Sequence, residues 1–274
     1  MRIANFIHQG KSGIGQVEGG SIVPIAAPIP PDLAAYLAGW DAFGGAAWTN
    51  WEALSVADVE LLPPVPPAAK ILCVASNFRE DAAEPKPDPA YPLLFTRFAD
   101  SLVGHGALLE KPDVTDRFDF EGELAVVIGR AGHRIAEREA LAHVAGYTCF
   151  NDGSARDWQK HSSQFTPGKN FHRSGSCGPY LVTADEVGGV HRLALETRVN
   201  GVVKQRIGFD RFIFGIGWLI SYISSFTPLR PGDVIATGTP SGFGSSRSPQ
   251  EFLSKGDIVE VDIPGIGLLR NEVG

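Results

Sequence analysis

Residues 118–129 constrain the fold more than any other part of the chain. They read FDFEGELAVVIG, so two glutamates, Glu121 and Glu123, stand at the start of an apolar run that predicts a core strand. Side chains at positions i and i+2 of a strand point to the same face. We therefore expect Glu121 and Glu123 to project together at the edge of the core.

Paired carboxylates at a buried edge require a neutralising charge. Two like charges held side by side away from water are costly unless a cation compensates them. A third carboxylate, Asp152, ends a second apolar segment, residues 144–150. Three carboxylates with room for water suit a hard divalent cation such as Mg²⁺ or Mn²⁺. The alternative is a solvated strand face, and the polar run 151–159 that follows favours a site over that alternative.

Composition narrows the class of protein. The chain has 274 residues and a formal net charge of −7, which argues against nucleic-acid binding. Its densest apolar run, residues 212–226, is short for a membrane span and contains Gly, Ser and Tyr. The three cysteines, Cys73, Cys149 and Cys177, have no metal-ligand spacing and lie in apolar or Gly-rich contexts, so we expect reduced core residues. These features predict a soluble, cytoplasmic protein.

Segments rich in glycine and proline divide the chain into domains and short structural elements. The Pro-rich stretch 62–67 predicts a boundary between a small N-terminal domain, residues 1–66, and a larger domain, residues 67–274. Many short strands and few helices predict an α+β fold that is mostly β. The expected elements are a β-meander over 1–25, a short helix over 32–38, a buried strand over 71–75, a charged, proline-rich lid over 80–91, and helices over 138–144 and 212–226.

Eight short motifs occur in a fixed order across about three quarters of the chain. Together they resemble the fumarylacetoacetate hydrolase family. The resemblance implies a mixed β-roll catalytic domain, a homodimer, and Mg²⁺ or Mn²⁺ held by Glu121, Glu123 and Asp152, with Ca²⁺ as an alternative occupant in crystals. It also implies chemistry on 2-oxo acids. The motifs are FEGEL (120–124), AGYT (145–148), NDGSARD (151–157), GKNF (168–171), GP (178–179), VNG (199–201), PGDVIATGTP (231–240) and GIG (265–267).

The resemblance also assigns roles to polar residues. Lys169 is expected near the metal, where it binds an oxyanion or the substrate carboxylate; without the family it would be a surface lysine. Arg156 and Gln159, one helical turn apart, are expected in the substrate pocket rather than on an exposed helix face. Thr239 offers a hydroxyl or backbone N–H to substrate, or simply forms a tight turn. Arg97 replaces a lysine common in acylpyruvate-cleaving members, and its guanidinium is expected to grip a substrate carboxylate bidentately.

The chain departs from the family at the lid. Hydrolytic members carry Asn-Tyr-x-x-His-x-x-Glu, whose His–Glu dyad activates water. Here the glutamate is kept as Glu84, but the histidine position is Asp81. Aspartate can act as the base only if burial or Glu84 raises its pKa. Asp81 and Glu84 are the candidate catalytic pair, and His105 and His172 are possible substitutes for the missing imidazole.

Three functions therefore stay open. The function we predict first is hydrolytic C–C cleavage of a 2,4-dioxo acid of the acylpyruvate type, because Glu84, Lys169, Arg156 and Gln159 are all kept. The second keeps the metal but omits the water step, giving a 2-oxo acid decarboxylase or a keto–enol isomerase. The third, a non-catalytic binder of oxo acids, is disfavoured because a decayed site has no reason to keep three buried charges. In each case the partner is a small 2-oxo acid, not nucleic acid or membrane.

Overall fold

The protein is described here by a computed structural model covering residues 1–25, 52–65, 69–80 and 87–274. Strands predominate, and α5 (Ile216–Phe226) is its longest described helix. The mostly-β α+β class expected from the sequence is confirmed. The helix expected at 32–38, the domain boundary at residues 66–67 and half of the proposed lid, residues 81–86, lie outside the described ranges.

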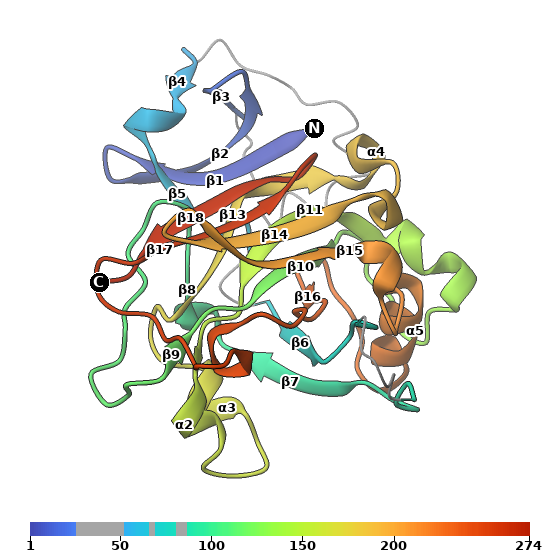
Figure 1. Ribbon diagram of the computed structural model, residues 1–274. Helices are drawn as coiled ribbons and strands as arrows, with labels where there is room; N and C mark the ends of the chain where they lie inside the picture. The colour runs from blue at the N-terminus through green and yellow to red at the C-terminus, as the bar shows by residue number, and fades with distance from the viewer. Residues whose placement is uncertain (26–51, 66–68, 81–86) are drawn as a thin grey trace.

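A large mixed sheet forms the framework (Figure 1). Its central strand β10 pairs antiparallel with β11 on one side and with β16 on the other, and β16 pairs parallel with β6. The expected strand over 71–75 is confirmed as β6. The bounds of this part of the sheet are β6 Ile71–Ala75, β7 Leu93–Arg97, β8 Leu102–Val103, β10 Gly122–Ile128, β11 Val144–Asn151, β13 Gly175–Thr183 and β16 Val234–Ala236.

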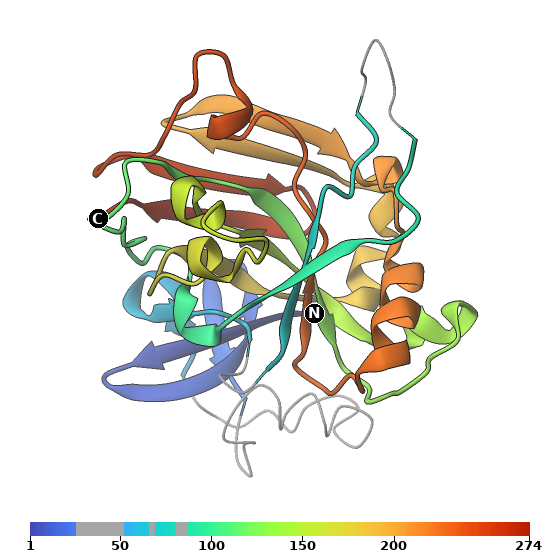
Figure 2. The same cartoon turned by 90° about the horizontal axis from the view of Figure 1, so that it is seen from below.

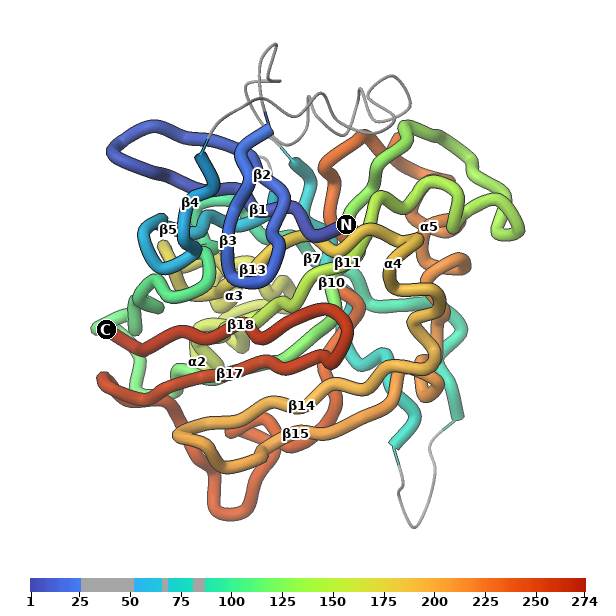
Figure 3. Tube along the Cα trace, turned by 90° about the horizontal axis from the view of Figure 1, so that it is seen from above, coloured from blue at the N-terminus to red at the C-terminus, as the bar shows by residue number. Residues whose placement is uncertain are grey.

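The N-terminal strands extend the same sheet. The predicted meander over 1–25 is confirmed: β1, β2 and β3 pair antiparallel in sequence order. β1 also pairs with β13 of the larger part, which joins the meander to the main sheet (Figure 3). The bounds are β1 Arg2–His8, β2 Lys11–Glu18, β3 Ser21–Pro24, β4 Leu54–Ser55, the 3₁₀ turn η1 Val56–Asp58 and β5 Glu60–Leu62.

A second, four-stranded sheet packs on the first. Its strand order is β15-β14-β17-β18, and all neighbours are antiparallel. Alternate residues such as Val261 and Ile263 are buried and belong to one core with Leu124 and Val126 of β10. The bounds are β14 Ala194–Val199, β15 Val202–Gly208, β17 Ile258–Ile263 and β18 Gly267–Glu272.

Strand β10 is buried on both faces, which explains the unbroken apolar run over residues 124–128. Leu124 and Val126 share a core with α5, whereas Ala125 and Val127 face a second core that includes residues of the N-terminal strands. Glu123 lies on the same face as Ala125 and Val127 because side-chain direction alternates along a strand. The glutamate pair therefore ends a face that is otherwise hydrophobic.

The expected helices differ in detail from the structure. The segment over 138–144 is a 3₁₀ helix, η3 (Glu137–His143), and α5 begins at Ile216 because the chain is extended at Gly215. Cys73, Cys149 and Cys177 are buried and unpaired, as expected. No helix within the described ranges is long and apolar enough to cross a membrane.

Short elements complete the structure around the sheets. The helices α2 and α3 lie beside each other next to β7 (Figures 1 and 2). The bounds are η2 Ala99–Ser101, β9 Phe118–Asp119, β12 Ser154–Ala155, α2 Arg156–Gln159, α3 Thr166–Lys169, α4 Ala184–Val187, η4 Val190–Arg192, η5 Phe209–Arg211 and η6 Gly244–Ser246.

Candidate metal centre and active site

Three buried carboxylates converge where β10 begins and β11 ends. One oxygen from each of Glu121, Glu123 and Asp152 lies within 4.8 Å of the others. The β10–β11 ladder pairs Gly122 with Asn151, and the Asp152 amide donates to the Glu121 carbonyl at 2.9 Å. This pairing joins the two acidic segments, which are about 30 residues apart in sequence. The structure therefore brings together the three carboxylates that the sequence indicated.

Basic side chains enter the cluster from other elements. Lys169, at the end of α3, is 1% exposed and donates from Nζ to Glu121 Oε2 at 2.7 Å and to Asp152 Oδ2 at 2.6 Å. Arg156 pairs with Glu121, and Arg97 pairs with Asp152 at 2.6 Å. Lys169 is thus a buried part of the site and not a surface lysine.

The carboxylates are unequally paired with basic side chains, and the pKa shifts of Glu123 and Asp152 differ accordingly. Burial, reinforced by the charges of Asp152 and Glu121, raises the pKa of Glu123 well above its usual value. Burial would also raise the pKa of Asp152, but Lys169 and Arg97 hold it below its usual value. Burial opposes the charge of Lys169, yet the two carboxylates raise its pKa. Lys169 therefore remains an ammonium, while Glu123 retains a proton over a wider pH range than an ordinary glutamate.

The donor set fits a divalent cation. All three groups supply carboxylate oxygens, the ligands preferred by Mg²⁺ and Mn²⁺. The ammonium of Lys169 already bridges two of them, which shows that the cluster accommodates positive charge between Glu121 and Asp152. Glu123 has the raised pKa of a carboxylate that lacks sufficient compensation, and a bound cation would supply it.

A pocket of about 180 Å³ opens onto this cluster. Part of its wall is apolar, formed by Val74, Leu93, Phe95, Phe165 and Phe243. The small volume restricts the site to a compact ligand. The pocket is also lined by six residues that the sequence singled out, namely Glu121, Glu123, Arg156, Gln159, Lys169 and Thr239.

Arg156 lines this pocket and has one unused donor. Its Nε donates to Asp119 at 2.7 Å, and its Nη1 donates to Gln159 Oε1 at 3.1 Å. Its Nη2 is buried and has no acceptor within the described chain. The guanidinium carbon lies 4.6 Å from the ring centroid of Phe243. Because a buried donor without an acceptor is costly, Nη2 is suited to an acceptor atom of a ligand.

Asp119 is a site-supporting residue that the sequence analysis missed. It is fully buried and accepts from the Gly244 amide at 2.7 Å and the Ser245 amide at 2.8 Å as well as from Arg156. It therefore ties Arg156 to the 244–246 turn. Its position two residues before Glu121 was an available signal, since it extends the same i, i+2 alternation.

Thr239 contributes its hydroxyl to the frame of the site. The hydroxyl donates to the Gly122 carbonyl at 2.9 Å and accepts from Gln205 Nε2 at 2.8 Å. The neighbouring Gly238, with φ of +99°, donates its amide to Glu123 Oε2 at 2.8 Å. Gln205 comes from β15 and carries no sequence signal for this role.

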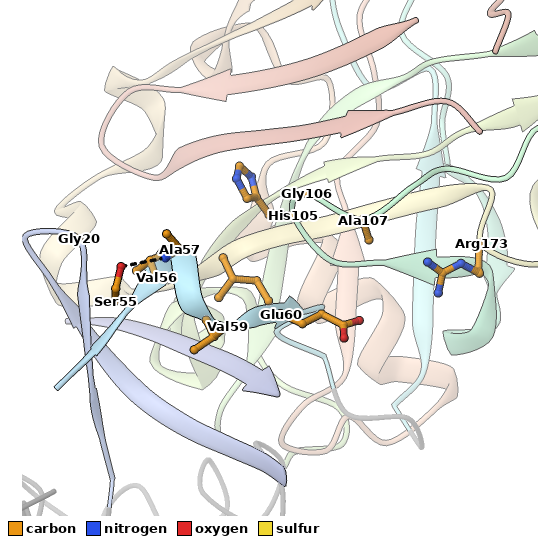
Figure 4. A pocket seen from close by; sticks show the side chains of 11 residues that line it. Gly20, Ser55, Val56, Ala57, Val59, Glu60, His105, Gly106, Ala107 and Arg173 are labelled. Atoms are coloured by element: carbon orange, nitrogen blue, oxygen red, sulfur yellow. Dashed lines mark hydrogen bonds between the residues drawn. The ribbon is translucent and has the colours of Figure 1, made fainter. Parts of the chain in front are cut away.

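The other expected residues lie elsewhere. Arg97 does not line the pocket, and its side chain is 0% exposed, which does not favour the expected grip on a substrate carboxylate. His105 lines a different cavity of about 690 Å³ between the N-terminal strands and the 104–107 turn (Figure 4). Its Nδ1 accepts from the Arg270 amide at 3.2 Å, and burial lowers its pKa. His172 is exposed, and Asp81 and Glu84 lie outside the described residues.

Known proteins are similar to this chain in sequence and in fold. Residues 70–274 match the fumarylacetoacetate (FAA) hydrolase C-terminal model, and residues 1–64 match an Rv2993c-like N-terminal model. Oxaloacetate tautomerase YisK of Bacillus subtilis is 41% identical over 225 residues, covering 80% of this chain and 75% of the relative.

Solved structures agree with this assignment. A fumarylacetoacetate hydrolase from Exiguobacterium antarcticum has a TM-score of 0.88 and 33% identity, covering 100% of this chain and 99% of that one. A 5-carboxymethyl-2-hydroxymuconate delta-isomerase from Mycobacterium smegmatis has a TM-score of 0.83 and 30% identity, with the same coverage. With three buried carboxylates at the motif positions and a family model matching most of its length, the chain belongs to the fumarylacetoacetate hydrolase family.

Proposed function

We propose that the protein is a metal-dependent keto–enol tautomerase of a small 2-oxo dicarboxylic acid, with oxaloacetate as the first candidate substrate. The observation that carries the proposal is the buried Lys169 ammonium beside three carboxylates in a pocket of only about 180 Å³. The relative named as an oxaloacetate tautomerase, at 41% identity, supports isomerisation, while the solved structures named as a hydrolase and an isomerase, at 33% and 30% identity, do not separate the two reactions.

Glu121, Glu123 and Asp152 would hold the divalent ion. When bound, that ion would supply electrophilic polarisation of the 2-oxo group. Lys169 keeps its proton because two carboxylates raise its pKa, so its ammonium stabilises negative charge that develops on the substrate oxygen. The Phe95 ring centroid lies 5.0 Å from Lys169 Nζ, and Phe95 and Phe165 give the pocket an apolar wall, which would strengthen that electrostatic stabilisation.

Arg156 and Gln159 supply the recognition of a second anionic group. Both residues line the pocket, and the Gln159 carbonyl accepts a hydrogen bond from Arg156 Nη1. Arg156 Nη2 needs an acceptor, and a carboxylate oxygen is the acceptor that best matches a guanidinium. A carboxylate held there, in addition to the 2-oxo acid group at the metal, specifies a dicarboxylate.

Hydrolysis is less well supported by the geometry. It requires a general base to activate water, for which histidine is the usual group near neutral pH. The described residues that line the pocket include no histidine, and the family's lid histidine is Asp81 in this chain. Tautomerisation and decarboxylation both proceed without adding water, so neither needs a base that activates a water molecule. Tautomerisation still transfers a proton between C3 and the C2 oxygen of the substrate.

Proton NMR with oxaloacetate distinguishes the three reactions. Metal-free protein and protein with Mg²⁺ or Mn²⁺ are each mixed with enol oxaloacetate, and the approach to the keto–enol equilibrium is followed. We expect faster equilibration with metal and no change in the final ratio. Pyruvate formation above the rate without protein would indicate a decarboxylase. Unaccelerated tautomerisation together with cleavage of acetylpyruvate or fumarylpyruvate would show a hydrolase and overturn the proposal.

The Asp81→Ala variant adds a second discriminator. A tautomerase that depends on the metal and Lys169 should retain most of its activity in this variant. A hydrolase that uses Asp81 as its base should lose roughly 10²- to 10⁴-fold in kcat. On the resemblance to its family we further propose that the protein acts as a homodimer in the cytoplasm; light scattering after gel filtration checks the dimer.

A further inference from the structure

Arg97 is fully engaged by the protein. Its side chain is 0% exposed and makes five hydrogen bonds, which equals the number of N–H donors on a guanidinium. Nε donates to Ser101 Oγ at 3.1 Å. Nη2 donates to the Ser101 carbonyl at 3.3 Å and to Ser174 Oγ at 3.0 Å. These contacts leave no donor for a substrate.

The remaining two bonds converge on the segment that carries Asp152. Arg97 Nη1 donates to Asp152 Oδ1 at 2.6 Å and to the Gly153 carbonyl at 2.9 Å. The other oxygen, Oδ2, faces Lys169 Nζ at 2.6 Å. Arg97 therefore binds one carboxylate oxygen of Asp152, Oδ1, and leaves the other, Oδ2, directed toward Lys169 and the acidic cluster.

The fold reserves space for this guanidinium. Gly175, at the start of β13, lies directly against it: a Cβ at this position would be 2.6 Å from Arg97 Nη2 and 2.8 Å from Cζ. Real Cβ atoms essentially never make contacts this short, and the same Cβ would lie 2.9 Å from the Asn151 carbonyl oxygen, so a larger residue at 175 requires the guanidinium or the β11 backbone to shift. η2 and the segment leading into β13 thus form a binding site for the Arg97 guanidinium.

We propose that Arg97 is a positioning residue that fixes the orientation of Asp152 for metal binding and makes no contact with the substrate. The inference rests on the metal site of the proposed function, but it does not depend on which reaction occurs there. A lysine in its place would supply three donors from one atom instead of five from a planar fork. It could neutralise Asp152 but could not hold Asp152, Gly153 and both serines at once.

Calorimetric titration of metal-free protein with Mn²⁺ tests this role without any substrate. Loss of a group that orients a metal ligand typically weakens metal binding by about 10- to 100-fold, and we expect that loss in Arg97→Lys. Arg198→Lys is the matched control. Arg198 also holds carboxylates, those of Glu196, Glu260 and Asp262, but lies on the second sheet, and its variant should bind Mn²⁺ as the wild type does.

Gly175→Ala is a second variant that changes no charge. Its added methyl should press on the Arg97 guanidinium and on the Asn151 carbonyl that precedes Asp152, and should weaken Mn²⁺ binding in the same direction. Wild-type Mn²⁺ affinity in both variants would overturn the inference. Wild-type Mn²⁺ affinity in Arg97→Lys together with a raised KM for the oxo acid would also overturn it, and would restore Arg97 as a substrate contact. A wild-type protein that binds no Mn²⁺ would overturn the metal site itself. Weakened binding without any turnover of oxo acids would refute only the proposed reaction.

Discussion

Two groups of three acids in this protein are built from the same residue types and differ in burial. On the second sheet, Arg198 pairs with Glu196, Glu260 and Asp262, and its side chain is 21% exposed. At the end of β10, Glu121, Glu123 and Asp152 meet Arg97, Arg156 and Lys169, whose side chains are 0–7% exposed.

Burial changes what the same pairing does. In the outer cluster, hydrogen bonds from Arg206 and Arg198 lower the pKa of Glu196, so its carboxylate is satisfied. In the inner cluster the pKa of Glu123 is raised because burial and two neighbouring carboxylates outweigh Lys169. Water screens and completes the outer cluster, whereas the inner one must obtain its compensation from the protein or from a cation. That requirement distinguishes a site from a surface network.

The largest expected effect comes from removing the buried ammonium. Lys169→Met leaves Glu121 and Asp152 without their shared partner, and breaking a buried ion pair costs about 3–5 kcal/mol. Urea unfolding of the metal-free protein, followed by circular dichroism, measures this loss. The outer counterpart Arg206→Met, at a side chain 69% exposed, should cost no more than about 1 kcal/mol. Equal stability of the two variants would contradict the contrast between the clusters.

Glu123→Gln should abolish most of the metal affinity. The change removes one ligand but keeps an acceptor for the Gly238 amide, so the loss should exceed the roughly 100-fold expected for a supporting residue. Because the variant also relieves carboxylate repulsion, its metal-free form should be at least as stable as the wild type. Calorimetry with Mn²⁺ tests the first statement and thermal melting the second. Glu260→Gln in the outer cluster is the control, and unchanged Mn²⁺ affinity in Glu123→Gln would disprove the assignment.

Asp119→Asn should affect substrate binding more than metal binding. The substitution removes the charge that holds Arg156 Nε, and a hydrogen bond to a charged group contributes about 1.5–3 kcal/mol. We expect KM for a dicarboxylic oxo acid to rise by about 10-fold or more, with Mn²⁺ affinity retained. Steady-state kinetics and calorimetry give the two numbers. A parallel fall in Mn²⁺ affinity would show that Asp119 supports the carboxylates and not the pocket arginine.

The smallest effect is in the pH dependence of stability. Because the pKa of Glu123 is raised in the folded metal-free protein, the folded state binds the proton more tightly than the unfolded state does. Its contribution to stability is therefore present below the unfolded value and is lost as pH rises through the folded pKa. Melting temperatures across this range should fall less in Glu123→Gln than in the wild type. The pKa of Glu196 is lowered, so its contribution to wild-type stability is lost as pH falls. The melting temperature of Glu196→Gln should therefore fall less than that of the wild type as pH is lowered.

Much of the fold and the carboxylate cluster could be predicted from local sequence pattern. The apolar run after Glu121 predicted a core strand, and the i, i+2 spacing predicted that Glu121 and Glu123 would share a direction. The segment ending at Asp152 predicted a second strand, and β10 and β11 do pair with their acidic ends together. Local rules succeed here because strand alternation does not depend on distant contacts.

The roles of the basic residues could not be predicted in the same way. A guanidinium at position 97 was expected to face a substrate, but its acceptors on Asp152 and Ser174 lie 55 and 77 residues away. Gly175, which makes space for it, gives no local sign of that function. Asp119 followed the alternation but lacked an apparent partner, since Gly244 and Ser245 reach it only through the folded chain.

The sequence by itself determined the mostly-β class, the buried strand β10 and the family, and with them the three acids that can hold a metal. Only the tertiary structure decided which cation meets which acid. It directed Arg97 toward Asp152 in the core and left Arg156 Nη2 buried without an acceptor in the described part of the chain. The physical reason is that side-chain direction along a strand is fixed by backbone geometry, whereas the compensation of a buried charge depends on every element that packs around it.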